Sequence, residues 1–264
     1  MNKKTFIVIV AALLFVSNNA MAWGAFGHGA IAYIAEKHLT PKAKAECRRY
    51  LSHTLPYYSS WMDRWRGVPP FHPTNDWHGF PVGANGDVDW DNANGKAMGQ
   101  LHRIVNEMGN GNYKKLSDSL VRQNLLILVH MLPDMHCPVH VTFSKKYYPE
   151  YRYSIKRNGR PYKTHTFWDA STTFTRKGWT YEKYASEVDK VTPKQVKKIV
   201  KKGNLTYWGQ DIIKQAHRAY VLTPKGVDVA EFTDEEKAQA LALADEMALK
   251  AAYRLAYLLN DIFK

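Results

Sequence analysis

Apolar positions along this chain recur mainly with the spacing of a helix, so the pattern predicts a mainly α-helical protein. Thr40 precedes a proline at the first helical position, which predicts a helix over 42–51. From Ser117 onward, apolar residues between 120 and 129 are dense enough for a buried helix, and that helix carries His130.

A second pattern predicts the last helix. Thr233 and Glu236 have the spacing of a capping box, and an alanine-rich and leucine-rich segment follows as far as Phe263. This helix is predicted to support the architecture rather than the chemistry.

Polar, aromatic and glycine-rich stretches separate the helical segments. They predict long loops over 69–95, 147–163 and 203–209, with a small hairpin near Asn158-Gly159. Loops of this length often carry function.

The N-terminus has the order of a secretory signal peptide. Lysines at positions 3 and 4 precede an apolar stretch over 6–16, and Ala20-Met21-Ala22 follows as a small-residue cleavage site. We therefore predict a leader over 1–22 and one domain over 23–264, in the periplasm or secreted. The apolar stretch is short for a bilayer, so no stable membrane insertion is predicted.

The composition favours an anionic partner. Formal net charge is +13, and it would fall to +11 when Lys3 and Lys4 leave with the leader. Such an excess favours polyanions or anionic surfaces, although the lysine run over 194–202 is equally consistent with a solvated helix face. No obligate protein partner is indicated.

The chain has only two cysteines, Cys47 and Cys137. An exported protein of this length with so few cysteines does not depend on a disulfide framework, so bound metal is the alternative means of stabilisation. Whether the two pair, or each remains a buried thiol, is open at this point.

Two motifs have the spacing of metal ligands. His130 and Asp134 share a helix face, and prolines at 133 and 138 are expected to turn the chain so that His140 points back toward them. His165 and Asp169 repeat the same four-residue spacing. Imidazole and carboxylate ligands without a required thiolate are most simply explained by zinc.

These residues resemble the zinc-dependent single-strand nucleases of the S1/P1 type. The resemblance extends to Trp23 and His28 at the expected mature N-terminus, to Trp61-Met62-Asp63, and to His78. It implies a helical phosphoesterase fold, similar also to bacterial zinc phospholipase C, with long loops around a metal cluster.

The resemblance further implies three zinc ions. One would be bound by Asp63, His78, His130 and Asp134, a second by His140, His165 and Asp169, and a third by the Trp23 backbone, His28 and Asp134. The α-amino group of Trp23 could serve only after cleavage, because it must be free and deprotonated. Six other histidines are predicted to be surface or packing residues: His38, His53, His72, His102, His136 and His217.

The function implied is hydrolysis of single-stranded RNA and DNA, with 3′-nucleotidase activity as a further possibility. Three ions could supply a nucleophile, neutralise charge at the phosphate and stabilise the leaving 3′ oxygen, which would give 5′-phosphorylated products. Asp63 and Asp134 are the predicted catalytic carboxylates, and Arg66 matches an arginine that meets the phosphate. The alternative for Arg66 is a surface arginine packed on Trp65.

One position departs from the family pattern. The nucleases commonly place an aromatic residue after the histidine at position 78, where it stacks on a base, whereas this chain has Gly79. Trp77 or Phe80 could replace it, since stacking is worth roughly 1–3 kcal/mol per base.

Two other functions remain open from the sequence. A zinc phospholipase C would use similar ligands, but it typically has glutamate where this chain has Asp169. A noncatalytic, basic zinc-binding protein would bind without turnover.

Overall fold

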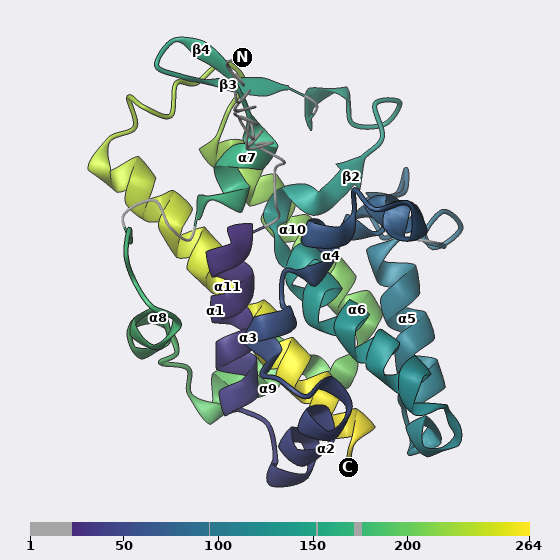
Figure 1. Ribbon diagram of the computed structural model, residues 1–264. Coiled ribbons are helices and arrows are strands. Elements are labelled where there is room, and N and C mark those ends of the chain that lie inside the picture. Colours follow the sequence, from purple (N-terminus) through teal and green to yellow (C-terminus); the bar gives the residue numbers. More distant parts are fainter. Residues whose placement is uncertain (1–22, 95, 152, 172–175) are drawn as a thin grey trace, which may run out of the picture.

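The computed structural model describes residues 23–94, 96–151, 153–171 and 176–264. The predicted leader over 1–22 lies outside the described residues. Figure 1 shows a protein built largely of helices of very different lengths, which confirms the mainly α-helical prediction. The strands of the described residues form two small two-stranded sheets. Within the described part of the chain, no helix is both long enough and apolar enough to span a membrane.

The helices occupy most of the chain. In order they are α1 Gly24–Lys37, α2 Pro41–Leu51, α3 Leu55–Tyr58, α4 Trp61–Trp65, α5 Ala97–Met108, α6 Asp118–His136, α7 Thr164–Asp169, α8 Tyr181–Val188, α9 Pro193–Val200, α10 Leu205–Leu222 and α11 Asp234–Ile262. Short 3-10 helices are η1 Pro69–His78, η2 Asn112–Lys115, η3 Pro138–His140, η4 Pro149–Tyr151 and η6 Lys201–Gly203. The strands are β1 Phe80–Val82, β2 Val141–Phe143, β3 Ser154–Arg157 and β4 Arg160–Lys163.

The predicted helix starts are confirmed at atomic detail. The Thr40 and Ser117 side chains each accept a hydrogen bond from a backbone N–H three residues on, at the starts of α2 and α6. At α11, Thr233 and Glu236 form both hydrogen bonds of the capping box. Local polar chemistry therefore fixes where these helices begin.

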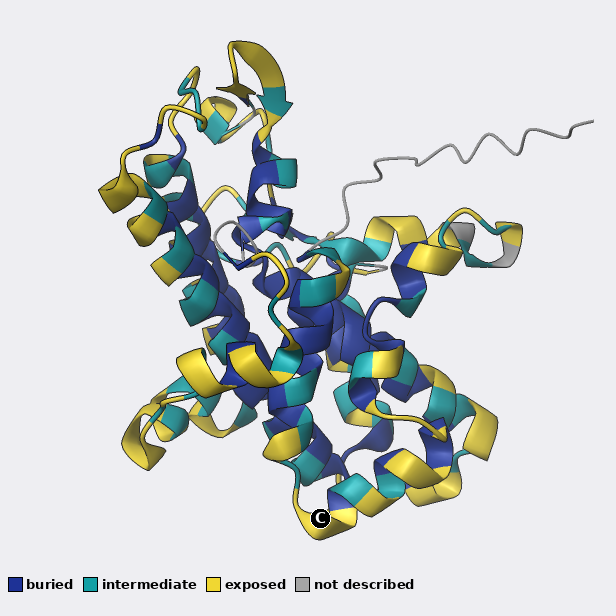
Figure 2. Cartoon of the chain, turned by 60° about the vertical axis from the view of Figure 1, so that its left-hand side comes forward, coloured by how far each residue is buried: buried dark blue, intermediate teal, exposed yellow. Residues whose placement is uncertain are grey.

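Helices α1, α6 and α11 form the centre of the protein. α1 packs along α11, and both also contact α6. The buried faces of α1 and α11 contain many alanines, which allow these two helix axes to approach closely. Figure 2 shows buried segments concentrated where these helices meet, with exposed residues on the outer faces.

The strands serve two separate purposes. β1 and β2 pair in parallel, with Phe80 opposite Val141, so the segments that end in His78 and His140 lie side by side. β3 and β4 form an antiparallel hairpin around Asn158-Gly159, as predicted. The first pair belongs to the site described below.

Two sequence predictions are corrected. The expected loop over 203–209 is wrong, because α10 begins at Leu205 with Asn204 as its N-cap, and Gly209 is buried inside the helix. A Cβ at Gly209 would lie 2.4 Å from Cγ2 of Val88, so this glycine reflects a close approach and not a turn. Pro133 was expected to turn the chain, but α6 continues through it to His136.

The lysine run over 194–202 includes α9, which has no buried residue. A solvated basic helix face, one of the two possibilities open from the sequence, therefore describes this segment.

A buried polar network joins α11 to α6 and α10. Arg254 is fully buried and donates to Asp211 Oδ2 at 2.5 Å and to His136 Nε2 at 2.9 Å. Because His136 Nδ1 donates to the Leu132 carbonyl, Nε2 is free to accept. The network holds the C-terminal half of α6, which carries the candidate ligands.

We expect Arg254→Ala to lower the free energy of unfolding by about 3–5 kcal/mol, because it removes one partner of a buried ion pair. Arg218→Ala is the control, since Arg218 pairs with Glu246 at 2.8 Å on the surface and such pairs contribute about 0.2–1 kcal/mol. Urea denaturation of both variants measures the difference. Equal losses would show that the network does not stabilise the fold.

Candidate metal centre

The first group of predicted ligands comes from four separate elements. His28 lies on α1, Asp63 on α4, His78 at the end of η1, and His130 and Asp134 on consecutive turns of α6. The packing of α1 and α4 on α6 brings these side chains together.

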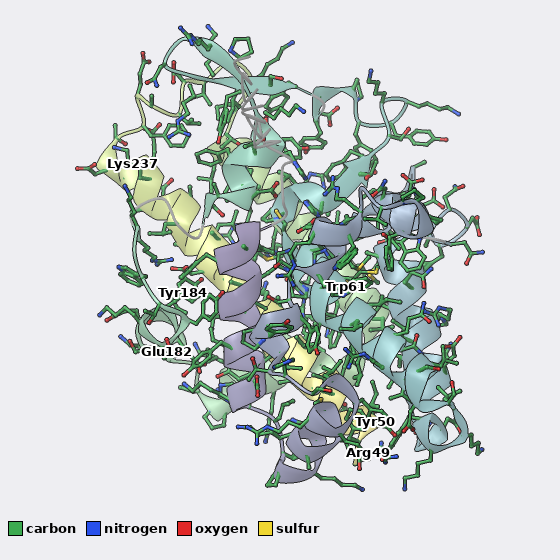
Figure 3. All side chains as sticks on the ribbon, viewed as in Figure 1. Arg49, Tyr50, Trp61, Glu182, Tyr184 and Lys237 are labelled. Carbon is green, nitrogen blue, oxygen red and sulfur yellow. The ribbon has the colours of Figure 1, made fainter. Side chains whose placement is uncertain are left out.

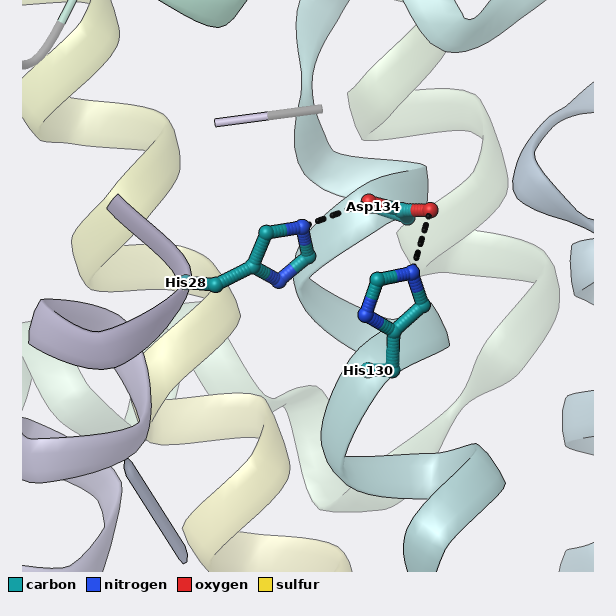
Figure 4. Close-up of side chains that lie close together, drawn as sticks. All are labelled: His28, His130 and Asp134. Carbon is teal, nitrogen blue, oxygen red and sulfur yellow. Dashed lines mark ion pairs between the residues drawn. The ribbon is translucent and has the colours of Figure 1, made fainter. Parts of the chain in front are cut away.

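Asp134 lies at the centre of this group. His28 Nε2 is 2.9 Å from Asp134 Oδ1, and His130 Nε2 is 3.2 Å from Asp134 Oδ2, as Figure 4 shows. His78 Nδ1 also contacts Asp134 Oδ2. The carboxylate therefore faces imidazoles on both of its oxygens, which is the arrangement needed to bridge two cations.

Asp63 completes the first group. Its Oδ1 lies 4.0 Å from both His78 Nδ1 and His130 Nε2, and its Oδ2 lies 3.9 Å from His28 Nε2. The donor atoms of Asp63, His78 and His130 all lie within 4.8 Å of one another, as do those of His28, His130 and Asp134. Two overlapping metal sites can form from these five residues.

The second group surrounds Asp169. His140 Nε2 lies 3.5 Å from Asp169 Oδ1, His165 Nδ1 lies 3.2 Å from Asp169 Oδ2, and the two histidine Nε2 atoms are 2.8 Å apart. All three predicted ligands are thus brought together where η3 meets α7.

Trp23 is placed against α6. Its side chain is fully buried, and its indole Nε1 donates to the Pro133 carbonyl at 2.8 Å. The Pro133 carbonyl is available because the Cys137 N–H, at the end of α6, donates to the backbone carbonyl of Asp134 instead. The contact holds Trp23 against α6 at Pro133, the residue that precedes Asp134.

Backbone carbonyls orient two of the histidines. His130 Nδ1 donates to the Ser59 carbonyl at 2.7 Å, and His140 Nδ1 donates to the His78 carbonyl at 2.7 Å. With Nδ1 engaged in this way, Nε2 is the atom of each ring that would bind a metal, which would displace any proton there. No sequence pattern indicated Ser59, because the backbone carbonyl of any residue could accept this hydrogen bond.

Unpartnered buried atoms show that the donor set fits metal ions. Among the described residues, buried side-chain N and O atoms without a hydrogen-bond partner occur almost entirely here, on His28, Asp63, His78, Asp134 and Asp169, with Glu46 as the exception. Leaving such atoms unsatisfied costs free energy, which bound cations would recover. Imidazole nitrogens and carboxylate oxygens are the ligand types expected for zinc.

Electrostatics at Asp134 and His28 also suit a cation site. Burial raises the pKa of Asp134, but the facing imidazoles of His130 and His78 outweigh it and hold the pKa well below its usual value. Burial lowers the pKa of His28. The result is an ionised carboxylate beside a neutral imidazole, which are the protonation states that bind metal.

His140 and His165 differ in protonation. Burial opposes charge on His140, but hydrogen bonding to Asp169 and the charges of Asp134 and Asp169 raise its pKa to about 9. Burial and the neighbouring His140 lower the pKa of His165 to about 4. The pair therefore shares one proton near neutral pH, so a cation here would displace that proton.

Arg66 lies at the edge of the first group. Its Nη1 donates to Asp63 Oδ1 at 3.2 Å, and its side chain is partly exposed. The guanidinium is thus directed by an ion pair toward the candidate site, where its remaining N–H groups can meet a phosphate.

Gly79 has a structural explanation. A Cβ at this position would lie 2.2 Å from the His140 carbonyl oxygen, so only glycine allows β1 to approach η3 this closely. An aromatic side chain after His78 would therefore not fit here, because the segment that follows His78 lies directly against the segment that carries His140.

The histidines predicted to lie outside the cluster do so wherever the structure describes their side chains. His38 pairs with Asp189, His136 with Arg254 and His217 with Tyr151, while His53 and His102 lie against aromatic rings. The side chain of His72 lies outside the described residues.

Cys137 and Cys47 are both free and buried, which answers the question of their pairing. Cys137 lies at the second group: its Sγ donates to Asp169 Oδ1 at 3.4 Å. Burial raises its pKa well above 9.0, so the thiol stays protonated and can act as the donor. This contact orients the Asp169 carboxylate and was not predicted from the sequence.

We expect Cys137→Ala to weaken zinc binding at the second group by about 10- to 100-fold, the usual cost of losing a hydrogen bond to a metal ligand. Cys137→Ser keeps a donor and should bind more tightly than the alanine variant. Competition with a chromophoric chelator measures the affinity. Cys47→Ala is the matched control, and equal zinc affinity in both alanine variants would contradict the role of Cys137.

Comparison with known proteins agrees with this geometry. The sequence model of the family described as S1/P1 Nuclease matches residues 23–264. Over 126 residues, or 45% of this chain, the sequence is 26% identical to Nuclease P1 of Penicillium citrinum. The same figures hold for Nuclease PA3 of a Penicillium species. Each match spans 47% of the relative, so the chain aligns with about half the length of these curated proteins.

Proposed function

We propose that this chain, which belongs to the S1/P1 nuclease family, is a zinc-dependent nuclease that hydrolyses single-stranded RNA and DNA. The observation that carries the proposal is the convergence of buried, unpartnered donors from α1, α4, η1, α6 and α7. The products would carry 5′ phosphates, and 3′-nucleotidase activity belongs to the same proposal.

Three zinc ions would occupy the centre. Asp63, His78, His130 and Asp134 would hold one, His140, His165 and Asp169 a second, and the Trp23 backbone with His28 and Asp134 a third. When bound, the ions supply Lewis acidity for the phosphate, an activated water and charge neutralisation at the leaving oxygen.

The chain's own residues orient the substrate. The Asp134 carboxylate would fix the spacing of two ions, and Asp63 would hold both an ion and the Arg66 guanidinium. The free N–H groups of Arg66 would donate to nonbridging phosphate oxygens. Burial of Asp134 and His28 would exclude bulk water and so strengthen these interactions.

A cavity beside His165 supports a nucleotide substrate. Its volume is about 890 Å³, and its lining includes Lys145, Lys163, Tyr151 and Tyr153. Lysines can pair with phosphates, and aromatic rings provide surfaces for bases. With Gly79 in place of an aromatic residue, we propose that base contacts lie on this side of the centre.

Zinc phospholipase C activity remains the competing proposal. Asp169 in place of glutamate, the arginine at 66 and the net charge of +13 favour nucleic acid over phospholipid. Noncatalytic zinc binding is less well supported, because the partly exposed His165 and Arg66 leave the centre open to a ligand.

The test compares substrates with the zinc-loaded protein that begins at Trp23. We expect cleavage of single-stranded RNA and DNA into fragments with 5′ phosphates, with activity lost in a strong chelator and restored by zinc. End analysis of a short oligonucleotide identifies the products. Turnover of phosphatidylcholine alone would favour the phospholipase, and chelator-resistant cleavage would contradict use of this centre.

The proposed role of the leader gives a separate prediction. If the Trp23 amino group binds an ion after export and cleavage between Ala22 and Trp23, a protein that keeps extra residues before Trp23 should hold two zinc ions instead of three. Elemental analysis of both forms measures this difference. Equal zinc content would show that the free amino group is not a ligand.

A further inference from the structure

Helix α4 has a second face, directed away from the metal centre. Consecutive residues of a helix are rotated by about 100°, so Trp65 lies roughly opposite Asp63, while Trp61 and Trp65 share one face. Asp63 is buried toward the metal centre, whereas Trp65 is 50% exposed. The face of α4 away from the metal centre borders a cavity of about 570 Å³.

Aromatic rings form much of the wall of this cavity. Its lining includes Tyr57, Tyr58, Trp61 and Trp65. Tyr57 and Trp65 are 57% and 50% exposed, which places them among the most exposed large hydrophobic residues in the described chain. Flat, accessible rings of this kind can stack on a base of any sequence.

The rings are held in place by their neighbours. Trp61 Nε1 donates to the Leu126 carbonyl of α6 at 2.6 Å, and Figure 3 shows Trp61 beside that helix. Both tryptophans lie against Phe71, at ring-centroid distances of 5.9 Å. A ligand would therefore meet a surface that needs little ordering, which lowers the cost of binding.

The charge of the cavity is positive. Among its described lining residues, the charged ones are Arg64 and Arg122. Neither forms an ion pair with a described carboxylate: Arg64 donates to the Tyr57 carbonyl, and Arg122 to the Tyr50 carbonyl and the Tyr58 hydroxyl. The positive charge is thus available to an anionic ligand.

Two other cavities differ in this respect. The cavity between α8, α9 and α11 contains Glu187, Asp245 and Glu246 in its wall, and the cavity beside α1 and α3 contains Glu36 and Glu182. Basic side chains in the same walls, Arg176, Lys198 and Lys250 in the first and Lys37 and Lys44 in the second, balance these carboxylates, so neither wall has a net positive charge. The combination of exposed aromatic rings and arginines therefore singles out the cavity at Trp65.

We propose that this cavity is a subsite for a further nucleotide of the same single strand, with its base stacked on Trp65 and its phosphate near Arg64. The inference rests on the proposed nuclease function. Arg66 follows Trp65 directly and donates to Asp63. It would contact the phosphates that lie between the metal centre and the cavity at Trp65. A helix is about 10–12 Å across with its side chains, so the subsite serves nucleotides beyond the one being cleaved.

The experiment uses the zinc-loaded protein and two substrates, a thymidine dinucleotide and a thymidine octanucleotide. We expect Trp65→Ala to raise KM for the octanucleotide by about 5- to 150-fold relative to KM for the dinucleotide, the effect of losing one stacked base. Trp65→Phe should keep most of the wild-type ratio. Trp90→Ala removes a tryptophan that is 40% exposed elsewhere and is the matched control.

A binding measurement separates failure of the subsite from failure of the proposed function. Deoxyadenosine 5′-monophosphate has no diester to cleave, so its binding can be followed by calorimetry whether or not the protein is a nuclease. We expect a binding event that Trp65→Ala abolishes and Trp90→Ala retains. An unchanged KM ratio or unchanged nucleotide binding in Trp65→Ala would overturn the subsite, whereas absence of turnover by the wild type would overturn the nuclease assignment alone.

Discussion

The structure depends on one buried carboxylate, that of Asp134. Burying a charge in a helical core is costly unless opposite charge or metal accompanies it. Here imidazoles from α1, η1 and α6 surround the carboxylate, and the facing His130 and His78 hold its pKa low. The same contacts join three elements distant in sequence, so a chemical requirement of the site is also a constraint on the fold.

The scaffold around Asp134 limits how its neighbours can move. Arg254 fixes the end of α6 through His136, and the Trp23 indole bonds to the Pro133 carbonyl in the same turn. Pairing of β1 with β2, which Gly79 permits, sets the second group of ligands beside the first. Backbone carbonyls orient the rings of His130 and His140, and the Cys137 thiol orients the Asp169 carboxylate. Rigid positioning of this kind is what a metal centre requires.

Positive charge also lies in two cavities near the metal centre. The cavity beside His165 carries lysines, and the one beside Trp65 carries arginines, so each combines positive charge with aromatic rings. They border two different parts of the centre, α7 and α4. The lysines of α9, by contrast, form a solvated face without a buried residue. Net charge alone does not distinguish these surfaces, but the neighbouring side chains do.

The sequence by itself determined the helical class and the caps of α2, α6 and α11, because helical periodicity and capping depend on residues that are neighbours in the chain. It also determined which residues converge at the centre, because their motifs resemble those of a known family. Only the tertiary structure decided that Gly209 lies inside a helix against Val88, that Gly79 permits close strand pairing, and that Cys137 meets Asp169. It also placed Trp65 on the face of α4 opposite Asp63 within an arginine-lined cavity. These features depend on contacts between segments far apart in the chain, which no local pattern records.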